Sequence, residues 1–482
     1  MAEIKEENKQ MHDVASFPGV FITSLPALYR LDDKGSTEFA DRLSHRIQER
    51  INKHCFLDWY EILSKKIYVN NVFVSDHKPI VVSIGLNYRD TIKSEVMEFY
   101  KISYMKRFFE RTNTDLKEFL RDTVNSFIPT VSMCQSLYNW NDELDVLMEM
   151  FIVDGGFIIE LFWRNGDIKG NEFVDTILMS EWVLYAFSRD LILRDNQLPF
   201  QVLTMLFERT GLSAKLDQHD SNHHHKLTGL AFKFLERIVP NQKLDHKLVN
   251  IHNPNQDLLS TVYDGLSWLR PKANNNYNSN IDKDKKDIGD EKWNLVKSAT
   301  ELQEFGVEFK MVDTDNLVYI TLNKGVLCIP RIRIRYGTAY SINVLLQFEN
   351  SILRKEPGQP RCLTDYLWFM NSLVKSPNDV QLLRQKNIID NLSELPDDAA
   401  ILKFLKDLHE SLMISPANFS YKEICRNLNV HCSHRRNSWL AKLKRDYFNS
   451  PWAIISFFAA SLLLILTVAQ TGFSVASYYN QG

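Results

Sequence analysis

The sequence predicts a mainly α-helical fold, in which a multi-helix globular domain carries a small antiparallel β-hairpin and ends in one C-terminal transmembrane helix. Its 482 residues include only 17 Gly and 15 Pro, which disfavours the turn-dense β-sandwich class. Apolar residues recur three and four positions apart along most of the chain, as in amphipathic helices. From Tyr447 to Gly482 no residue is charged, although charged residues make up 24% of the chain. An uncharged stretch of this kind is typical of a membrane span.

Composition places the chain among folded proteins with a sizeable core. Hydrophobic residues make up 44%, which excludes wholesale disorder and a many-pass membrane protein, and the length gives a prior of about three domains. The formal net charge of −3 does not attract nucleic acid, so no nucleic-acid partner is expected. The charged N-terminus lacks the apolar run of a secretory signal. The cysteines form no CxxC motif and indicate a reducing compartment; they are Cys55, Cys134, Cys328, Cys362, Cys425 and Cys432.

The first part of the chain, residues 1–66, is expected to be a loose arm followed by one helix. That helix is predicted near 38–53, where Leu43, Ile47 and Ile51 share one stripe. The following stretch, 68–85, is rich in Val and Ile and is expected to be extended or strand-like.

A helical N-terminal subregion is expected over 67–271. Polar loops are expected at 213–226 and at 272–292. The second loop is rich in Asn and charge; it is predicted to be disordered and to divide the N-terminal from the C-terminal subregion. The predicted helices lie near 91–111, 114–137, 141–163, 175–193, 198–210, 226–238 and 256–268.

The C-terminal subregion, 293–434, is expected to combine a hairpin with further helices. Ser298 and Glu301 have the spacing of a capping box at a helix start. Segments 307–311, 318–322 and 326–334 alternate or are β-branched, and Asn323-Lys-Gly325 between the last two is a three-residue hairpin signal. The predicted helices lie near 338–353, 363–375, 378–386, 397–413, 418–430 and 435–449.

The transmembrane helix is predicted over 451–475. The stretch from Pro451 to Ala469 is about 28 Å long as a helix, close to the hydrocarbon thickness of a bilayer. Trp452 at one end, and Tyr478 with Tyr479 at the other, supply the aromatic side chains that favour the membrane interface. Pro451 suits the first helical turn. A buried core helix of a soluble protein is the alternative.

A basic juxtamembrane helix is predicted over 435–450, with aromatic and leucine residues at helical spacing. It lies in the membrane interface or, alternatively, is the solvated end of the last domain helix. Because positive flanks stay in the cytosol, the bulk of the chain is predicted to be cytosolic, at the plasma membrane or an endomembrane. The few residues after the span predict a tail-anchored protein. The basic residues are Arg435, Arg436, Lys442, Lys444 and Arg445.

No recognised catalytic motif is present, and no catalytic, cofactor-binding or metal-binding residue is assigned. The chain lacks a Walker loop, GxGxxG, GxSxG, HExxH and the kinase signatures. Two clusters with metal-ligand chemistry are interpreted as non-binding, because one lies on a polar loop and the other lacks zinc spacing. They are His219 with His223, His224 and His225, and Cys425 with Cys432 and His434.

Asp154, followed by Gly155 and Gly156, is the acid with the strongest case for chemistry. It sits among large apolar residues, where a raised pKa would suit a general acid. The alternative is that Asp154 caps or pairs locally and that the two glycines let another helix approach closely. Sequons at Asn391 and Asn418 matter only for a lumenal domain.

Five segments together resemble the plant family called domain of unknown function 247, over about 67 to 479. The resemblance implies a largely helical, membrane-anchored plant protein with no established enzymatic activity, in a family implicated in recognition processes such as grass self-incompatibility and in growth or defence. The segments are Val153–Phe162, Asp195–Phe200, Ser298–Leu302, Gly325–Pro330 and Arg445–Ala453, and Asp379–Leu383 with Ile388–Asn391 also match.

The chain departs from that family pattern at two places. Leu86-Asn-Tyr88 stands where the family has a proline and a histidine pair, so a ligand role for such a pair does not transfer. Asn387 stands where the family favours glycine.

The leading hypothesis is a membrane-tethered interaction or signalling protein, whose partners are the lipid bilayer and a protein of unknown identity. One alternative is a membrane-associated enzyme of unrecognised class, with Asp154 as its acid. Another is an extracellular recognition module of inverted topology, which the cysteine usage disfavours.

Overall fold

The computed structural model describes residues 31–53, 78–89, 95–138, 144–166, 181–216, 223–239, 244–249, 256–266, 296–314, 316–335, 337–355, 361–392, 395–409, 412, 418–433 and 451–480. Three predictions fall outside the described residues: the arm before residue 31, the loop 272–292 and the basic helix 435–450. Of the stretch expected to be extended, residues 78–85 are described.

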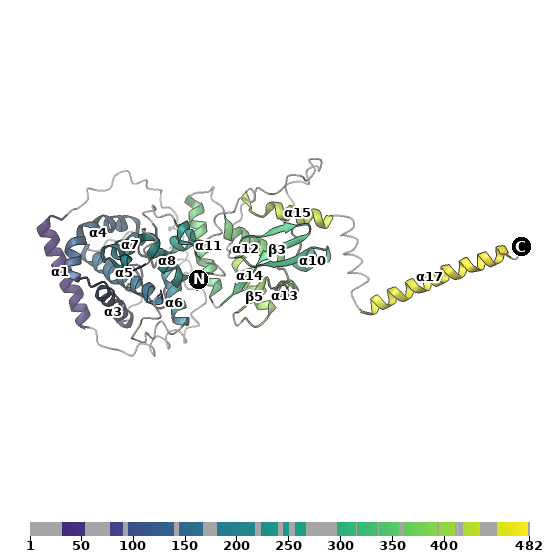
Figure 1. The fold of residues 1–482 in the computed structure, drawn as a ribbon, viewed down its shortest axis with the longest axis horizontal. Helices are drawn as coiled ribbons and strands as arrows, with labels where there is room; N and C mark the ends of the chain where they lie inside the picture. Colours follow the sequence, from purple (N-terminus) through teal and green to yellow (C-terminus); the bar gives the residue numbers. More distant parts are fainter. Residues whose placement is uncertain are drawn as a thin grey trace, which may run out of the picture. The chain divides into compact units, whose positions relative to one another are not determined.

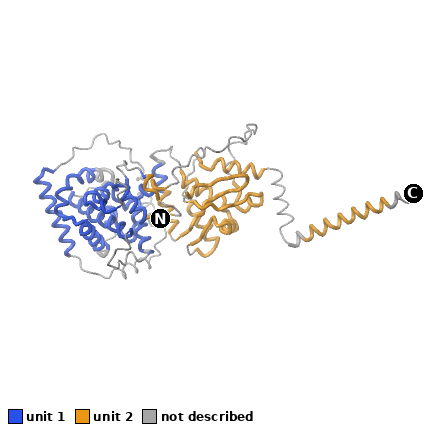
Figure 2. The backbone as a smooth tube through the Cα atoms, viewed as in Figure 1, with its two compact units in different colours: residues 1–234, 249–262, 347–359 blue, residues 235–248, 263–346, 360–482 orange. Residues whose placement is uncertain are grey.

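The chain forms two compact units, each assembled from several segments (Figure 2). Unit 1 comprises residues 1–234, 249–262 and 347–359. Unit 2 comprises residues 235–248, 263–346 and 360–482. Each unit therefore depends on contacts between parts of the chain that are far apart in sequence.

Unit 1 is a helical body around one buried helix, α5. Almost every residue of α5 from Leu147 to Asn165 is buried, because large apolar side chains occur on every side of this helix and must be covered by other helices. Figure 1 shows α5 in the middle of the unit, and α3, α4 and α7 contact it. The elements are α1 (Asp33–Lys53), α3 (Glu95–Thr112), α4 (Leu116–Tyr138), α5 (Leu144–Gly166), α6 (Glu181–Leu191), α7 (Phe200–Arg209) and η1 (Leu212–Lys215), with parts of α8 (His223–Leu235), α9 (Leu258–Asp264) and α11 (Thr338–Lys355).

The helices expected in this unit are confirmed with shifted ends, but the loop expected over 213–226 is wrong in part. Most of 213–216 belongs to the 3-10 helix η1, and α8 already begins at His223. The buried positions of α8 start only at Leu227, so the apolar pattern predicted the helix one turn late.

Unit 2 contains a mixed three-stranded sheet. The strands β1 (Glu308–Val312), β2 (Thr321–Asn323) and β3 (Val326–Pro330) lie in the order β1-β3-β2. The expected hairpin is present between β2 and β3, which pair antiparallel. Its turn is Lys324-Gly325, both with positive φ of 49° and 84°, rather than a three-residue loop. Two left-handed residues match the twist of the flanking strands.

The expectation of an antiparallel hairpin alone is wrong, because two of the strand pairs are parallel. β1 pairs parallel with β3, and β4 (Ile332–Ile334) pairs parallel with β5 (Ile389–Asn391). Parallel partners need a crossover connection, and β4 and β5 lie far apart in the chain. Local alternation of apolar residues carries no information on such a pairing, so β5 was missed.

The helices of unit 2 frame these strands. Ser298 caps α10 as predicted: its N–H donates to Oε2 of Glu301 (2.8 Å), and its Oγ accepts from the Glu301 N–H (3.4 Å). The further elements of unit 2 are η2 (His246–Leu248), α10 (Ala299–Glu304), α12 (Cys362–Leu373), α13 (Pro377–Gln385), α14 (Asp398–His409), α15 (Lys422–Ser433) and α17 (Pro451–Asn480).

Asn387, where the family favours glycine, ends α13 in the left-handed conformation with φ 57°. Its N–H donates to the carbonyl of Arg384 (2.9 Å), and the N–H of Ile388 donates to that of Leu383 (2.9 Å). This is the Schellman arrangement, in which asparagine is the best substitute for glycine. The departure therefore keeps the local turn.

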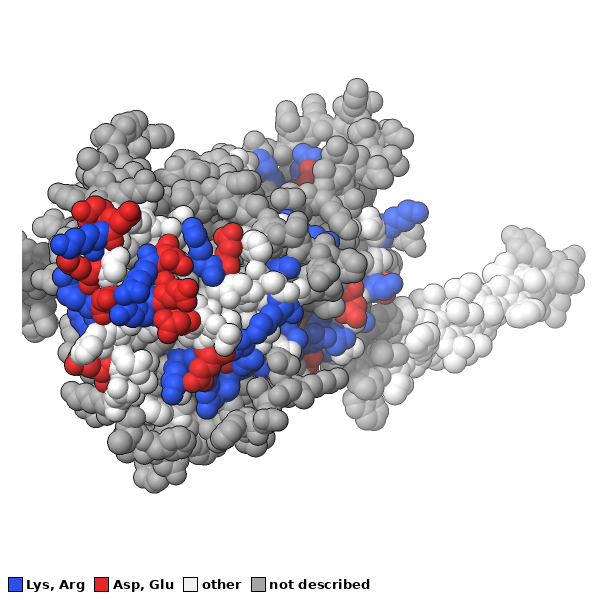
Figure 3. All heavy atoms as spheres, turned by 60° about the vertical axis from the view of Figure 1, so that its left-hand side comes forward, with Lys and Arg blue, Asp and Glu red and all other residues white. Residues whose placement is uncertain are grey.

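α17 is the one helix among the described residues that is long and apolar enough to cross a membrane. The apolar stretch is Ile455–Ala476, 22 residues, and none of it is buried against the rest of the chain. In Figure 3 its described atoms are white throughout, without Lys, Arg, Asp or Glu.

Candidate functional site

Residues 78–85 are held in unit 1 by side chains instead of by a neighbouring strand. Three consecutive backbone N–H groups, from Ile80, Val81 and Val82, donate to the carboxylate of Asp190 at 3.0, 2.6 and 3.0 Å. Asp190 is fully buried in the last turn of α6. Its carboxylate therefore supplies the acceptors that a β-ladder would otherwise give this extended segment.

Asn196 continues this support within the segment Asp195–Phe200. Its Oδ1 accepts from the N–H of Ile84 (2.7 Å), and its Nδ2 donates to the carbonyls of Val82 (3.0 Å) and Asp190 (2.9 Å). Both functions of one amide are thus used to fix the extended segment. The segment Asp195–Phe200, which resembles the family, therefore has a structural role here: Asn196 holds residues 82–84 in place.

Gln197, the next residue, closes the connection between α6 and α7. Its Nε2 donates to the carbonyls of Leu191 (2.7 Å) and Leu193 (2.8 Å), and its Oε1 accepts from the N–H of Leu258 (3.1 Å). These bonds satisfy buried backbone groups that follow the end of α6.

Arg189 lies beside Asp190 and is 1% exposed. Its guanidinium donates to Oδ1 of Asp190 (2.9 Å) and to the carbonyl of Lys78 (3.3 Å). A buried arginine is stable only with such partners, so Arg189 and Asp190 depend on one another.

Asp154 fixes the other end of the same segment. Its Oδ2 accepts from the N–H of Gly85 (3.0 Å), a residue with φ 72°. The segment 78–85 is consequently held between carboxylates of two helices, Asp190 of α6 and Asp154 of α5.

Lys101 of α3 is the cation that faces Asp154, and its side chain is 4% exposed. Its Nζ lies 2.9 Å from Oδ1 of Asp154 and 3.0 Å from Oε1 of Glu98. Burial lowers the pKa of Lys101, but the two carboxylates outweigh that effect and hold the pKa above its usual value. Lys101 therefore stays charged at neutral pH.

Every acidic side chain of α5 has a basic partner. The prediction that Asp154 is a paired side chain is confirmed, but its partners, Lys101 and the Gly85 N–H, are far from it in the sequence and the pairing is not local. Breaking a buried pair strands the remaining charge, so the pairs with cations of α1 and α3 constrain those two helices against α5, whereas Arg164 belongs to α5 itself. The pairs are Asp145 with Arg46, Glu149 with Arg46 and Arg50, Asp154 with Lys101, and Glu160 with Arg111 and Arg164.

The glycine pair after Asp154 allows two helices to approach α5, as predicted. A Cβ on Gly155 would lie 2.4 Å from Cδ1 of Leu206 in α7. A Cβ on Gly156 would lie 3.0 Å from Cγ of Met105 in α3 and 3.3 Å from its Cα. Close contact on both sides leaves no room for a side chain.

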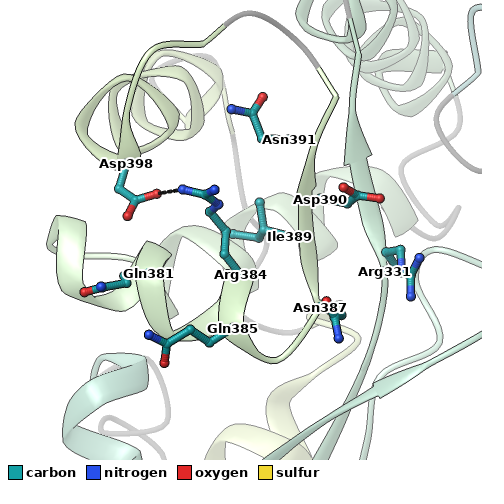
Figure 4. A pocket seen from close by; sticks show the side chains of 9 residues that line it. All are labelled: Arg331, Gln381, Arg384, Gln385, Asn387, Ile389, Asp390, Asn391 and Asp398. Carbon is teal, nitrogen blue, oxygen red and sulfur yellow. Dashed lines mark hydrogen bonds and ion pairs between the residues drawn. The ribbon is translucent and has the colours of Figure 1, made fainter.

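Unit 2 contains a polar pocket of about 470 Å³, within the usual range of small-ligand sites (Figure 4). In this view Ile389, Asn391 and Arg384 lie on one side of β5, and Asp390 and Arg331 lie on the other. Successive residues of a strand point to opposite faces, so the hollow follows the edge of β5. The lining residues are Arg331, Gln381, Arg384, Gln385, Asn387, Ile389, Asp390, Asn391 and Asp398.

The pocket is lined almost entirely by charged and amide side chains. Arg384 donates to Oδ1 of Asp398 at 2.5 Å, and a second arginine and a second aspartate balance the remaining charge. Apart from Ile389, the lining side chains are arginines, amides and two aspartates, Asp390 and Asp398. Its amides and charged groups offer donors and acceptors to a polar ligand.

The face of unit 1 seen in Figure 3 mixes Lys and Arg with Asp and Glu. Asp41 of α1, for example, pairs with Lys117 (3.1 Å) and Arg121 (2.8 Å) of α4. Among the described residues of this face, basic side chains therefore lie close to acidic ones, as in the Asp41 pairs.

The predicted membrane-boundary residues lie at the two ends of α17. Pro451 is its first residue, Trp452 follows, and Tyr478 and Tyr479 belong to its last turn; their side chains are outside the described part of the structure. The basic residues Arg435, Arg436, Lys442, Lys444 and Arg445 fall outside the described residues altogether.

The described histidines and cysteines of the two candidate metal clusters lie on two different helices, α8 and α15. His223, His224 and His225 form the first turn of α8, and burial followed by the charge of His225 lowers the pKa of His224 to about 4. Cys425 and Cys432 are buried free thiols of α15, as expected for core cysteines. No group of three His, Cys, Asp or Glu that could hold a metal occurs among the described residues. His219 and His434 lie outside them.

Sequence reasoning missed Asp190 and Asn196. The available signal was an arginine and an acid, Arg189 and Asp190, inside the otherwise apolar periodic stretch of α6, because charges at core positions need partners. Which backbone they bind was not readable, since residues 80–84 are far away in the chain.

The described part defines a mostly helical protein with a braced helical unit, a polar pocket beside a small sheet, and one long apolar helix. The chain belongs to the family described as a plant protein of unknown function, domain of unknown function 247, whose family model matches residues 40–466.

Two relatives come from Arabidopsis thaliana. The chain is 24% identical over 431 residues to UPF0481 protein At3g47200, which covers 84% of each protein. It is 26% identical over 177 residues to UPF0481 protein At3g02645, covering 36% of this chain and 32% of that protein. No solved structure shows significant similarity to the chain.

Proposed function

We propose that the chain is a single-pass membrane-anchored interaction protein, whose folded units are held in the cytosol by α17 and bind a protein partner. The observation that carries this proposal is the exposure of α17. Large hydrophobic side chains that are exposed among the described residues belong to α17, apart from Tyr319 and Leu392. An apolar surface of this extent marks a membrane or partner contact.

The length and composition of the span favour a bilayer over a protein groove. The apolar stretch Ile455–Ala476 is apolar all round, with Leu464 67% and Phe473 79% exposed, whereas a helix that docks in a groove needs one apolar stripe only. Twenty-two residues extend about 33 Å, enough to cross the hydrocarbon core with some tilt.

Charge and thiol chemistry support the cytosolic orientation. The basic residues between Arg435 and Arg445 precede the span and favour retention of that side in the cytosol. Burial raises the pKa of Cys425 to about 12 and that of Cys432 to about 11, so these thiols are unreactive structural groups. A domain on the secretory side would more often pair its cysteines.

Binding is favoured over catalysis by the state of the best candidate acid. Asp154 is 3% exposed and already engaged with Lys101 and the Gly85 N–H, so a substrate has no access to its carboxylate. The polar pocket of unit 2 is the proposed binding surface. Its charged and amide side chains would bind polar side chains of a partner peptide.

The anchoring is tested by alkaline carbonate extraction of membranes that contain the full chain. The wild-type protein is expected to stay in the membrane pellet, whereas a variant that lacks 451–482 is expected in the supernatant. Wild-type protein in the supernatant would contradict the proposal, because a span is not extracted by carbonate.

The role of the pocket is tested by proximity labelling in plant cells with two matched arginine variants. Arg384→Gln removes a pocket arginine that pairs with Asp398, and Arg426→Gln removes an exposed arginine that pairs with Glu423 outside the pocket. We expect Arg384→Gln to lose proteins that the wild type and Arg426→Gln both label. Identical labelling by all three would exclude the pocket as the binding surface.

A further inference from the structure

The strand β1 lies at one edge of the three-stranded sheet of unit 2, whose order is β1-β3-β2. It pairs parallel with β3, with Glu308 opposite Val326, and the N–H of Glu308 donates to the carbonyl of Gly325 (2.9 Å). In a parallel ladder, residues that bond to the neighbouring strand alternate with residues whose N–H and C=O point away from it. Glu308, Lys310 and Val312 are therefore the residues of β1 that bond to β3.

Phe309 and Met311 point their backbone N–H and C=O groups to the other side of β1, the free edge of the sheet. No described strand pairs with β1 on this side, and none of these four groups has a hydrogen-bond partner in the described part of the chain. An edge of this kind is a template for pairing with a further strand. Because the free groups belong to alternate residues, such a strand can pair in few registers only.

The side chains of β1 alternate between the core and the surface. Phe309 is 3% exposed, whereas Glu308 and Lys310 are both exposed. Their charges are opposite, and neither side chain has an ion-pair partner among the residues that the structure describes. The exposed face of β1 therefore matches a strand that carries the same two charges in the reverse order, which is β1 itself in the antiparallel direction.

We propose that β1 pairs antiparallel with β1 of a second copy of this chain, with Phe309 opposite Phe309 across a two-fold axis. In this register the N–H of each Phe309 donates to the carbonyl of the other, as the alternation of the free backbone groups requires. Glu308 of each copy then lies opposite Lys310 of the other. Opposite charges at directly opposed positions stabilise an antiparallel pair.

The exposed charges select this register among the symmetric ones that the free edge allows. With Phe309 opposite Met311, the two Lys310 side chains would face one another, and like charges in that position are destabilising. With Met311 opposite Met311, Lys310 would face Val312, and no oppositely charged pair would form. Charge complementarity in one register thus favours a second copy as the occupant of this edge.

The test measures the association of the full chain in detergent micelles by analytical ultracentrifugation over a range of protein concentrations. The wild type is expected to form dimers. Glu308→Lys and, separately, Lys310→Glu should each weaken dimerisation about tenfold, because each turns two opposite-charge contacts into two like-charge contacts. The double variant with both changes restores opposite charges and should dimerise as the wild type does. The control is Lys403→Glu, an exposed residue of α14, which should leave dimerisation unchanged.

Cysteine cross-linking measures the register directly. At a non-hydrogen-bonded position of an antiparallel pair, opposed Cα atoms lie about 4.5 Å apart, which a disulfide can span. A mixture of Glu308→Cys and Lys310→Cys chains should therefore form cross-linked dimers under mild oxidation. Lys310→Cys chains alone should not exceed the background of the wild type, because in this register the two copies of residue 310 are not opposed.

Either of two results would overturn the proposal: wild-type protein that is monomeric at every concentration, or dimers that both single charge reversals leave unchanged. The second result would place the contact elsewhere in the chain, since all of these variants keep α17. Cross-linking of Lys310→Cys chains with one another, but not with Glu308→Cys chains, would contradict the register.

Discussion

Asp154 and Lys101 form an ion pair of 2.9 Å between two helices, and both side chains are buried to within a few per cent. The same carboxylate accepts the N–H of Gly85, so one residue connects α5, α3 and the extended segment 78–85. The acid with the strongest sequence-based case for chemistry thus has a complete structural role.

Lys101→Met is expected to destabilise the protein by about 3 to 5 kcal/mol, because it leaves the buried carboxylate of Asp154 without its cation. Adding Asp154→Asn removes the stranded charge, so the double variant should be more stable than the sum of the two single changes predicts. Urea unfolding of the full chain in detergent, followed by circular dichroism, measures all four proteins. Strict additivity would contradict the pairing.

Asp190→Asn is expected to cost about 3 kcal/mol or more, since it turns a carboxylate that accepts three backbone N–H groups into an amide with its own donors. Asp195→Asn is the matched control, five residues away and exposed, and should change stability by less than about 0.5 kcal/mol. Hydrogen exchange at Ile80, Val81 and Val82 reports the effect locally. Unchanged protection of these amides in Asp190→Asn would show that the carboxylate does not hold the segment.

Gly155→Ala has two opposing effects on stability: a gain in helix propensity and a steric clash of the new methyl group. Alanine is favoured over glycine within a helix by about 1 kcal/mol, but the new methyl group would lie 2.4 Å from Leu206 and overpacking costs about 1 to 3 kcal/mol. We expect a net loss of stability. Gly166→Ala, whose methyl would meet Leu230 at an ordinary 3.5 Å, should be neutral or stabilising. Melting temperatures in the reverse order would refute the close packing of α5 and α7.

Asp379 predicts a pH dependence in unit 2. Burial raises the pKa of Asp379, but hydrogen bonds from Thr300 and Ser376 lower it by more than burial raises it. The pKa is therefore below its ordinary value. A depressed pKa contributes stability above the unfolded-state pKa of about 3.9 and loses it as the pH falls through the folded-state pKa.

The stability difference between wild type and Asp379→Asn should therefore be largest at neutral pH, about 1.5 to 3 kcal/mol, and should shrink as the pH falls below about 4. Urea unfolding at pH 7, 5, 4 and 3 measures it. A difference that grows toward low pH would mean that the carboxyl is bound in its protonated form.

The sequence alone predicted the features of this fold that depend on near neighbours. Helix positions followed from three-and-four spacing, the cap at Ser298 from the Glu301 three residues on, and the approach of helices at Gly155 from the absence of a side chain. Each is a local property that a short window of sequence contains. The apolar stretch of α17 is of the same kind.

The features that the sequence did not predict are contacts between distant segments. The bonds of Asp190 to residues 80–82 cross more than a hundred positions, and the parallel pairing of β5 with β4 depends on the folding of everything between them. The polar pocket arises in the same way, because Arg331 reaches it from a different part of the chain than Arg384 and Asp398. A single sequence contains no information on which distant segments come together. It therefore indicates the residues of a site but not how they are assembled.

The central claim, that α17 crosses a bilayer and keeps the folded units in the cytosol, is tested most directly by glycosylation mapping. An acceptor tag fused after Gly482 should be glycosylated, while Asn391 and Asn418, in unit 2, should remain unmodified. Glycans on Asn391 or Asn418 together with an unmodified tag would contradict the claim and place the folded units on the opposite side of the membrane.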